Sequence, residues 1–312
     1  MENNFPGGSW PVMLTPFTPD NQVDYQALKE LVEWYIRQGV SGLFAVCQSS
    51  EMFCLTLEER LAIASKVVSY AAGRVPVIAS GHVADKLEDQ IAELNAMANT
   101  GVDAVILITN RLAMEEESDE VWIENCKKIL EQVDPKIPLG FYECPYPYKR
   151  LLSIDTIRWC AESGRFFFLK DTCCDIVQIR KKINAIKGTN LKLYNANTTT
   201  LLDSLKAGAA GFSGVMDNFH PQLYTWLCNN FNSEKAEEIS SFLTVASLIE
   251  RQYYPVNAKY QLGQIEGLSI TTKSRVKDEK GLTDTFIKEI TALDYLAKIK
   301  IKEVQRRKSN EN

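Results

Sequence analysis

The sequence predicts a (β/α)8 TIM barrel followed by a C-terminal helical extension. Eight short apolar runs recur along the chain, and a segment with helical spacing of apolar residues follows each of them. Such alternation of strand and helix is typical of a parallel sheet, and eight units are the number that closes a barrel. From about Phe219 onward the alternation stops, and helical patterns alone continue.

The predicted strands are all short and rich in β-branched, aromatic or other apolar residues. They cover residues 12–14, 43–46, 75–79, 104–108, 138–142, 166–170, 191–194 and 210–213.

The first predicted helix shows how the segments between the strands were assigned. Apolar residues recur every three or four positions from Leu28 to Ile36, Asp24 precedes them as a candidate N-cap, and Gly39 follows as a stop signal. The same spacing predicts helices over residues 57–70, 88–98, 120–132, 154–160, 176–186 and 199–207.

We expect two regions: a barrel over residues 1–232 that carries the active site, and a helical region over residues 233–312. Helical patterns in the second region cover residues 234–252, 257–262 and 283–304, with a polar break at 271–274.

Composition excludes several classes of function. The 312 residues are 45% hydrophobic and carry a net charge of −5, which argues against nucleic-acid or anionic-membrane binding. The basic residues 298–308 are typical of a solvated helix end. No apolar run approaches the ~20 residues that span a bilayer, and residues 1–4 do not resemble the start of a signal peptide. We therefore expect a cytoplasmic protein.

Cysteine and histidine usage argues against disulfides and metals. The eight cysteines show no CxxC spacing, so we expect reduced thiols. With only two histidines, His82 and His220, neither a histidine-rich zinc site nor a Ser-His-Asp triad is supported, and we expect no metal.

Lys170 ends the sixth predicted strand, directly after Phe166–Leu169 in the sequence. Burial of an unpaired ammonium is costly, whereas a desolvated, neutral lysine amine can attack a carbonyl carbon and form a Schiff base. The alternative is a lysine whose charged end extends to the surface. Because barrel active sites lie at the C-terminal ends of the strands, the position favours the catalytic interpretation.

Two other strand ends offer groups that suit the same chemistry. Tyr142 ends the fifth predicted strand, where its phenol could move protons; the alternative is a packed tyrosine. After the second strand, the backbone N–H groups and hydroxyls around Ser49 and Ser50 could bind a carboxylate, although Ser-Ser turns are common. An amine, a phenol and a carboxylate site on one rim are what a 2-oxo acid requires.

The chain resembles the dihydrodipicolinate synthase and N-acetylneuraminate lyase superfamily of class I, pyruvate-dependent aldolases. The resemblance runs nearly from end to end. It rests on segments 14–17 and 23–28, the Ser49-Ser50-Glu51 turn, Tyr142 with Pro145, Leu169-Lys170-Asp171, residues 208–211 with Asn218, and residues 255–259.

The resemblance implies that Lys170 is the Schiff-base lysine, Tyr142 the proton donor and acceptor, and Ser49 with Ser50 the carboxylate clamp. It also implies a substrate contact by Thr172. Gln48, Ser213 and Arg111 complete the predicted substrate contacts, with Arg111 as a candidate for a second anionic group. Family members are commonly tetramers built from paired dimers, so we expect a homo-oligomer, either a dimer or a tetramer.

Several positions depart from the family pattern. Pro147 stands where synthases carry an arginine for a second carboxylate, and Asn110-Arg111-Leu112 stands where they carry relay tyrosines. Gln48 stands where the family motif carries its first hydroxyl-bearing residue, and Asn197-Thr198-Thr199 stands where sialic acid lyases carry an acidic pair.

Five further polar residues near these strand ends have less direct roles. We expect Glu51 to anchor its turn, Glu143 to hold its loop, and Cys173 with Cys174 to pack beside the lysine. His82 is a candidate for the lining of the pocket.

We predict a carbon–carbon lyase that forms a ketimine between Lys170 and a 2-oxo acid, with no cofactor. The substrate class is a 2-oxo-3-deoxy sugar acid or a similar 4-hydroxy-2-oxo acid. The enzyme would either cleave this acid to pyruvate and an aldehyde or form it from them by condensation. One alternative is a dihydrodipicolinate synthase-like synthase, or a dehydratase, that uses the same lysine. Another is a catalytically silent 2-oxo acid sensor. The sequence leaves open the aldehyde and the direction of the reaction.

Overall fold

The computed structural model describes residues 5–308 and shows the predicted barrel. Its eight-stranded sheet is parallel throughout and has the order β1-β8-β7-β6-β5-β4-β3-β2. A parallel bridge between Val12 and Phe44, with Met13 N–H donating to Phe44 O at 3.0 Å, joins the two ends of this sheet. The strands are β1 Gly8–Ser9, β2 Leu43–Phe44, β3 Val77–Ser80, β4 Ala104–Ile108, β5 Leu139–Tyr142, β6 Phe166–Asp171, β7 Lys192–Asn195 and β8 Gly211–Phe212.

The first strand lies earlier than predicted. Residues 12–14 were expected to form it, but β1 is Gly8–Ser9, and Val12 makes only an isolated bridge. Gly8 N–H donates to Ala210 O at 2.8 Å, so the two backbones approach closely. A Cβ built on Gly211 would lie 1.9 Å from Gly8 O. The pairing therefore needs glycine, a residue that strand propensity disfavours.

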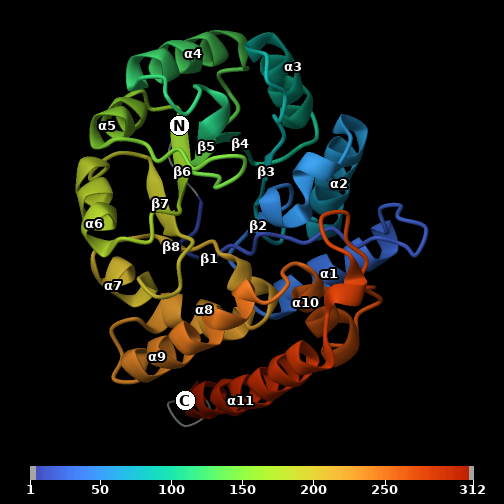
Figure 1. The fold of residues 1–312 in the computed structure, drawn as a ribbon. Helices are drawn as coiled ribbons and strands as arrows, with labels where there is room; N and C mark the ends of the chain where they lie inside the picture. The colour runs from blue at the N-terminus through green and yellow to red at the C-terminus, as the bar shows by residue number, and fades with distance from the viewer. Residues whose placement is uncertain (1–4, 309–312) are drawn as a thin grey trace.

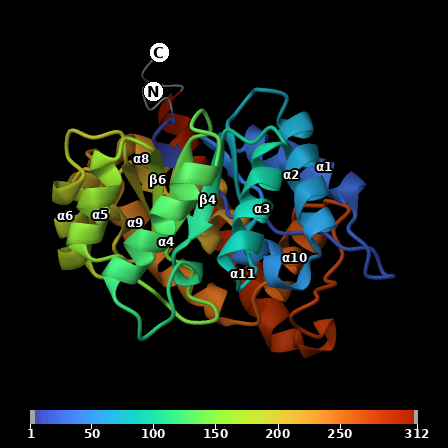
Figure 2. The same cartoon turned by 90° about the horizontal axis from the view of Figure 1, so that it is seen from above.

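Eight helices surround the strands. Figure 1 looks along the barrel and shows them as a ring, and Figure 2 shows the turned view, in which α3 and α4 lie in front of the strands. The predicted cap of the first helix is confirmed: Asp24 accepts a hydrogen bond from Ala27 N–H at 2.9 Å, and Gly39 follows the helix end with φ = 81°. The helices are α1 Tyr25–Arg37, α2 Leu57–Ala71, α3 Leu87–Ala98, α4 Asp119–Gln132, α5 Ile154–Glu162, α6 Ile176–Ala185, α7 Leu201–Lys206 and α8 Pro221–Asn230.

The C-terminal extension is helical, as predicted. It contains α9 Ala236–Ala246, a 3-10 turn at Ser247–Arg251, α10 Val256–Tyr260 and α11 Asp284–Lys308, which runs past α8 and α10 on the outside of the barrel (Figure 1). Between residues 5 and 308, no helix combines the length and apolar character needed to cross a bilayer.

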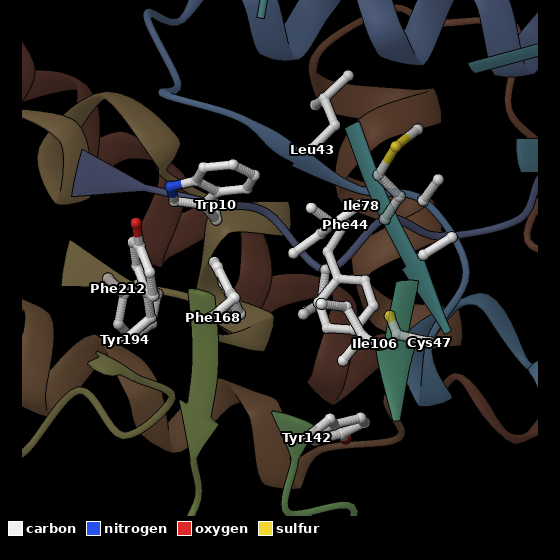
Figure 3. Packing of buried hydrophobic residues seen from close by; sticks show 14 of the residues in the cluster. Trp10, Leu43, Phe44, Cys47, Ile78, Ile106, Tyr142, Phe168, Tyr194 and Phe212 are labelled. Carbon is white, nitrogen blue, oxygen red and sulfur yellow. The ribbon is translucent and has the colours of Figure 1, made fainter. Parts of the chain in front are cut away.

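Aromatic side chains fill the barrel interior (Figure 3). Trp10 lies 5.2 Å from Phe168 between ring centroids, and Phe168 stacks on Tyr194 at 4.0 Å. Phe44 packs edge-on against Tyr142 at 5.9 Å. Since this interior is solid, ligand access is confined to the open C-terminal ends of the strands.

Candidate active site

A cavity of about 710 Å³ lies at the C-terminal ends of the strands. Five of the eight predicted site residues line it: Gln48, Ser49, Tyr142, Lys170 and Thr172. They come from the loop after β2, from β5 and from the end of β6. The barrel thus brings together side chains that are as far as 124 positions apart in the sequence (172 − 48).

Lys170 lies beside Tyr142 because the two residues are partners in the β5–β6 register. The amine is buried, and Nζ lies 4.1 Å from the centroid of the Tyr142 ring and 5.8 Å from that of Phe44. Burial lowers the pKa of Lys170, although the thiols of Cys47 and Cys144 oppose this shift. A larger fraction of the amine is therefore neutral, and nucleophilic, than in an exposed lysine.

Tyr142 presents a phenol that holds its proton. Its hydroxyl donates to Gln48 Oε1 at 3.3 Å, and the Cys144 thiol donates to the same oxygen at 3.5 Å. Burial raises the pKa of Tyr142 well above its ordinary value. The phenol can act as a proton donor, and Gln48 keeps it oriented toward the end of β2.

The two serines of the turn after β2 face different surroundings. Ser49 lines the cavity together with Tyr254. Ser50 is fully buried: its Oγ accepts from Cys47 N–H at 2.6 Å and donates to Cys47 O at 2.7 Å. Ser50 therefore closes its own turn, and only Ser49 is placed to contact a ligand.

Glu51 anchors this turn to the C-terminal extension, as expected. Its backbone is left-handed, with φ = 62°, and its carboxylate accepts from Lys259 Nζ at 2.6 Å, Ser274 Oγ at 3.0 Å and Arg275 N–H at 2.6 Å. The position of Ser49 is therefore supported by residues more than 200 positions away.

The structure does not place Arg111 at the cavity. Its guanidinium forms an ion pair of 2.7 Å with Asp85 and lies 5.5 Å from the ring centroid of Phe53, a residue that does line the cavity. An arginine that is already paired and stacked is poorly disposed to bind a substrate anion. In this structure Arg111 supports the wall behind Phe53.

Ser213 and His82 are also absent from the cavity lining among the described residues. Ser213 is fully buried, and its hydroxyl has no partner within residues 5–308. His82 accepts from Ile108 N–H at 2.6 Å through Nε2 and pairs through Nδ1 with Gln90 at 3.1 Å. Burial lowers the pKa of His82 to about 4, so the ring is neutral and structural.

Thr172 and Glu143 hold each other. Thr172 Oγ1 donates to Glu143 O at 2.6 Å, and Thr172 N–H donates to Glu143 Oε2 at 3.2 Å. Glu143 also accepts from Leu152 N–H at 3.0 Å. Glu143 thus holds its loop, as expected, whereas Thr172 lines the cavity with its hydroxyl already engaged.

Several cavity residues were missed by sequence reasoning. Tyr254 is one of them: it lines the cavity with Ser49, and its phenol accepts from Asn218 Nδ2 at 3.1 Å. The signal that could have found it is its place directly before the segment 255–259 that carried part of the family resemblance. Other missed lining residues are Phe53, Tyr146, Lys149, Asn197, Glu250 and Arg251.

No group of three or more His, Cys, Asp or Glu side chains within residues 5–308 is arranged to hold a metal ion. The polar groups of the cavity include two amines, phenols, hydroxyls and amides, together with the carboxylates of Glu51 and Glu250, the guanidinium of Arg251 and two thiols. The buried amine and the phenols among them suit covalent and proton-transfer chemistry.

Comparison with known proteins supports the same family. The model of the dihydrodipicolinate synthetase family matches residues 5–276. A 4-hydroxy-tetrahydrodipicolinate synthase of Shewanella piezotolerans is 27% identical over 265 residues, which cover 83% of this chain and 88% of the relative. The corresponding enzyme of Shewanella denitrificans is 29% identical over 230 residues, covering 74% and 76%.

Solved structures share the fold. The dihydrodipicolinate synthase of Acinetobacter baumannii, solved in complex with pyruvate, superposes with a TM-score of 0.84 at 24% identity, covering 94% of this chain and 99% of that one. The chain belongs to the dihydrodipicolinate synthetase family, and it is a carbon–carbon lyase of the class I aldolase type.

Proposed function

We propose that Lys170 forms a Schiff base with a 2-oxo acid, and that the enzyme makes or breaks a carbon–carbon bond next to the resulting imine. One observation carries this proposal: a buried amine with a lowered pKa faces a cavity, with Nζ 4.1 Å from the ring of a protonated tyrosine. A neutral amine beside a proton donor is the pair that imine formation needs.

The reaction begins when Lys170 Nζ attacks the C2 carbonyl carbon. The resulting carbinolamine loses water, with Tyr142 as the source of the proton that the leaving hydroxyl requires. Ser49, the cavity-facing hydroxyl of the turn after β2, donates to the substrate carboxylate. In the cleavage direction, the Tyr142 phenolate left by the loss of water accepts the 4-hydroxyl proton, the C3–C4 bond breaks, and the iminium accepts the electron pair as an enamine. No cofactor is needed for these steps.

The substrate class that suits this chemistry is a 4-hydroxy-2-oxo acid, such as a 2-oxo-3-deoxy sugar acid. The cavity of about 710 Å³ has room for an aldehyde-derived half beyond the three carbons of pyruvate. Dihydrodipicolinate-type synthesis or a dehydration with the same lysine is the enzymatic alternative, and Pro147 argues against the former. We also propose that the chain forms a homo-oligomer, as the family resemblance implies.

A reductive trapping experiment tests the proposal. The protein is incubated with pyruvate, reduced with borohydride, and digested for peptide mass mapping. We expect one reduced pyruvate adduct on Lys170 and none in Lys170→Arg, which retains a charge but has no nucleophilic amine at neutral pH. An unmodified Lys170 would contradict the Schiff-base chemistry.

Turnover distinguishes an enzyme from a 2-oxo acid sensor. A panel of aldehydes is offered with pyruvate, and a panel of 4-hydroxy-2-oxo acids is offered for cleavage. Trapping together with turnover supports the lyase, whereas trapping without turnover of any compound favours the sensor.

A further inference from the structure

We propose that Lys182 is a positioning residue that, through Glu143 and Asp171, fixes the catalytic amine relative to the catalytic phenol. We call these three side chains the strand-end ion cluster. The inference rests on the proposed Schiff-base function, because it concerns the geometry of Lys170 and Tyr142.

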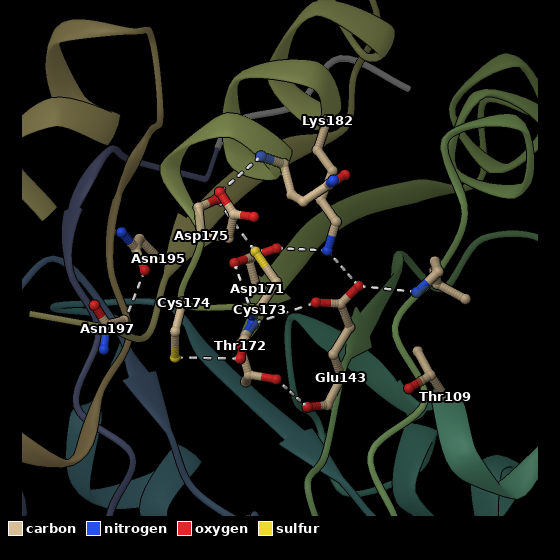
Figure 4. A network of polar contacts seen from close by, with 12 residues as sticks. Thr109, Glu143, Asp171, Thr172, Cys173, Cys174, Asp175, Lys182, Asn195 and Asn197 are labelled. Carbon is tan, nitrogen blue, oxygen red and sulfur yellow. Dashed lines mark hydrogen bonds and ion pairs between the residues drawn. The ribbon is translucent and has the colours of Figure 1, made fainter. Parts of the chain in front are cut away.

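The cluster connects the two strands that carry the reactive groups (Figure 4). Lys182 Nζ, from α6, lies 2.6 Å from Glu143 Oε1 and 2.5 Å from Asp171 Oδ2. Glu143 directly follows Tyr142, and Asp171 directly follows Lys170. The side chain of Lys182 is 3% exposed and those of both acids are fully buried, so water does not compete for these contacts.

Side-chain alternation explains why the cluster and the reactive pair lie on opposite faces of the sheet. Successive residues of a strand point to opposite sides. Tyr142 and Lys170 face the cavity, so the acids that follow them face α6, where Lys182 meets both. One ammonium group behind the sheet therefore sets the lateral spacing of the two strand ends in front of it.

Beyond the β5–β6 pairing itself, Thr172 Oγ1 also joins the two strand ends, donating to Glu143 O at 2.6 Å. Glu143 N–H donates to Lys170 O at a long 3.3 Å, and the β5 strand itself ends at Tyr142. Beyond that point the chain is held by Glu143, which accepts from Leu152 and Thr172 N–H. Since a displacement of about 1 Å can cost about a hundredfold in rate, loosening the cluster should affect catalysis.

The cluster contains two carboxylates and one ammonium, so its charges do not balance. Burial raises the pKa of Glu143 to about 7, helped by Asp171 and opposed by Lys182. Those two groups, from β6 and α6, are the charges that act on it, and the neighbouring Cys173 thiol senses Asp171 and Lys182. The three groups that contact the carboxylate of Glu143 are all donors, and protonation removes the negative charge that holds the Lys182 ammonium. The spacing should therefore loosen as the pH falls through about 7.

The chain offers a matched control for Glu143. Glu93 is another largely buried carboxylate that accepts from one cation, Arg60 at 2.8 Å, and from two backbone N–H groups, of Val83 at 2.7 Å and Ala84 at 3.1 Å. It joins α3 to the loop after β3, away from both reactive strands. Glu93→Gln should reproduce the loss of a buried ion pair without changing the strand spacing.

The test is the rate of pyruvate imine formation, measured by borohydride trapping between about pH 6 and pH 8 for folded protein of each variant. Glu143→Gln keeps the size of the side chain but replaces one acceptor oxygen by an amide N–H donor. Because the surrounding groups are donors too, the variant imitates the protonated state. We expect a loss of about tenfold or more relative to wild type at pH 8, and a smaller loss at pH 6, where the wild-type Glu143 is itself protonated. The rate of imine formation in Glu93→Gln should stay within about twofold of wild type, even if this variant loses as much thermal stability as Glu143→Gln.

A wild-type rate and pH profile in folded Glu143→Gln would overturn the inference. If that variant does not fold, Lys182→Arg provides the same measurement, since its charge is kept while its longer, planar group must spread the two acids. A wild-type rate in Lys182→Arg would again contradict the positioning role. If the wild-type protein gives no trapped pyruvate adduct, the Schiff-base proposal is contradicted instead. The two failures can therefore be distinguished.

Discussion

The two sides of the barrel mouth are built differently. On the β5–β6 side, residues 142–149 and 170–174, the reactive groups project from the strands themselves, and Tyr142 and Lys170 are register partners. On the β2–β4 side, residues 47–54, 80–86 and 109–114, most polar side chains belong to loops, and several are already paired with backbone groups or with other side chains. Ser50 closes its own turn, His82 bonds to Ile108, and Arg111 pairs with Asp85.

This difference shows when a polar residue at a strand end is available for chemistry. In a regular strand, alternation determines which side chains face the cavity. In a loop, short polar side chains compete for nearby backbone groups, and that competition decides which ones remain free. We therefore expect substitutions on the β5–β6 side to change catalysis, and most of those on the β2–β4 side to change stability.

The largest effect is expected for Tyr142→Phe, which removes the proposed proton donor. We expect kcat to fall about a hundredfold or more, in the range typical of a lost general acid, with thermal stability nearly unchanged. The control is Tyr148→Phe. Tyr148 lies in the loop after β5, and its phenol donates to Asn110 O and Ala113 O but lies outside the cavity lining. Equal kcat values for the two variants would contradict the assignment to Tyr142.

The adjacent serines of the turn after β2 should separate binding from stability. Ser49→Ala should raise the KM for pyruvate about tenfold, the value of one charge-assisted hydrogen bond of about 1.4 kcal/mol. Ser50→Ala should instead lower the free energy of unfolding by about 1–3 kcal/mol, because buried Cys47 groups lose their partner. Steady-state kinetics and urea unfolding of both variants check this. A higher KM in Ser50→Ala alone would contradict the assignment of carboxylate binding to Ser49.

Acid should destabilise the protein through its two buried histidines. Burial lowers the pKa of both His82 and His220 to about 4. The unfolded chain takes up these protons near pH 6.5, so stability is full above that pH and falls as the pH drops toward 4. Between pH 6.5 and 5.5 each histidine should account for a loss of about 1 kcal/mol. Urea unfolding of wild type and His220→Leu checks this, since the variant should lose about 1 kcal/mol less than wild type over this interval.

The smallest effect is expected for Arg111→Ala. Because Arg111 pairs with Asp85 away from the cavity, the KM for the 2-oxo acid and for the second substrate should change by no more than about twofold. Steady-state kinetics with each substrate tests this. A tenfold increase in either KM would restore the sequence-based prediction of an anion-binding arginine.

Most of the fold could be predicted from the sequence, because eight apolar runs and helical spacing report directly on burial. Seven of the eight strands overlap their predicted ranges, and residues 104–108 match β4 end to end. The first strand was misplaced because its pairing depends on close backbone approach at Gly8 and Gly211 rather than on apolar side chains. Glycine leaves no side-chain pattern to detect.

The site could be predicted where strand ends determine it. Lys170 and Tyr142 follow from position alone, and both line the cavity. Ser50 and Arg111 were misplaced because their nearest partners, Cys47 and Asp85, are set by loop geometry. Lys182 was not recognised because a lysine within a helix gives no sequence signal of two acids on the facing strands.

The contacts of Glu51 make the catalytic barrel dependent on the extension as a folding partner. Its left-handed backbone is held by Lys259, Ser274 and Arg275, all beyond residue 232. A barrel cut from its extension would lose the donors that keep the turn of Ser49 in place. In evolution or in protein engineering, the two regions should therefore be inherited or exchanged together: a chimaera that joins this barrel to a foreign extension would have to restore these donors before it could bind its substrate.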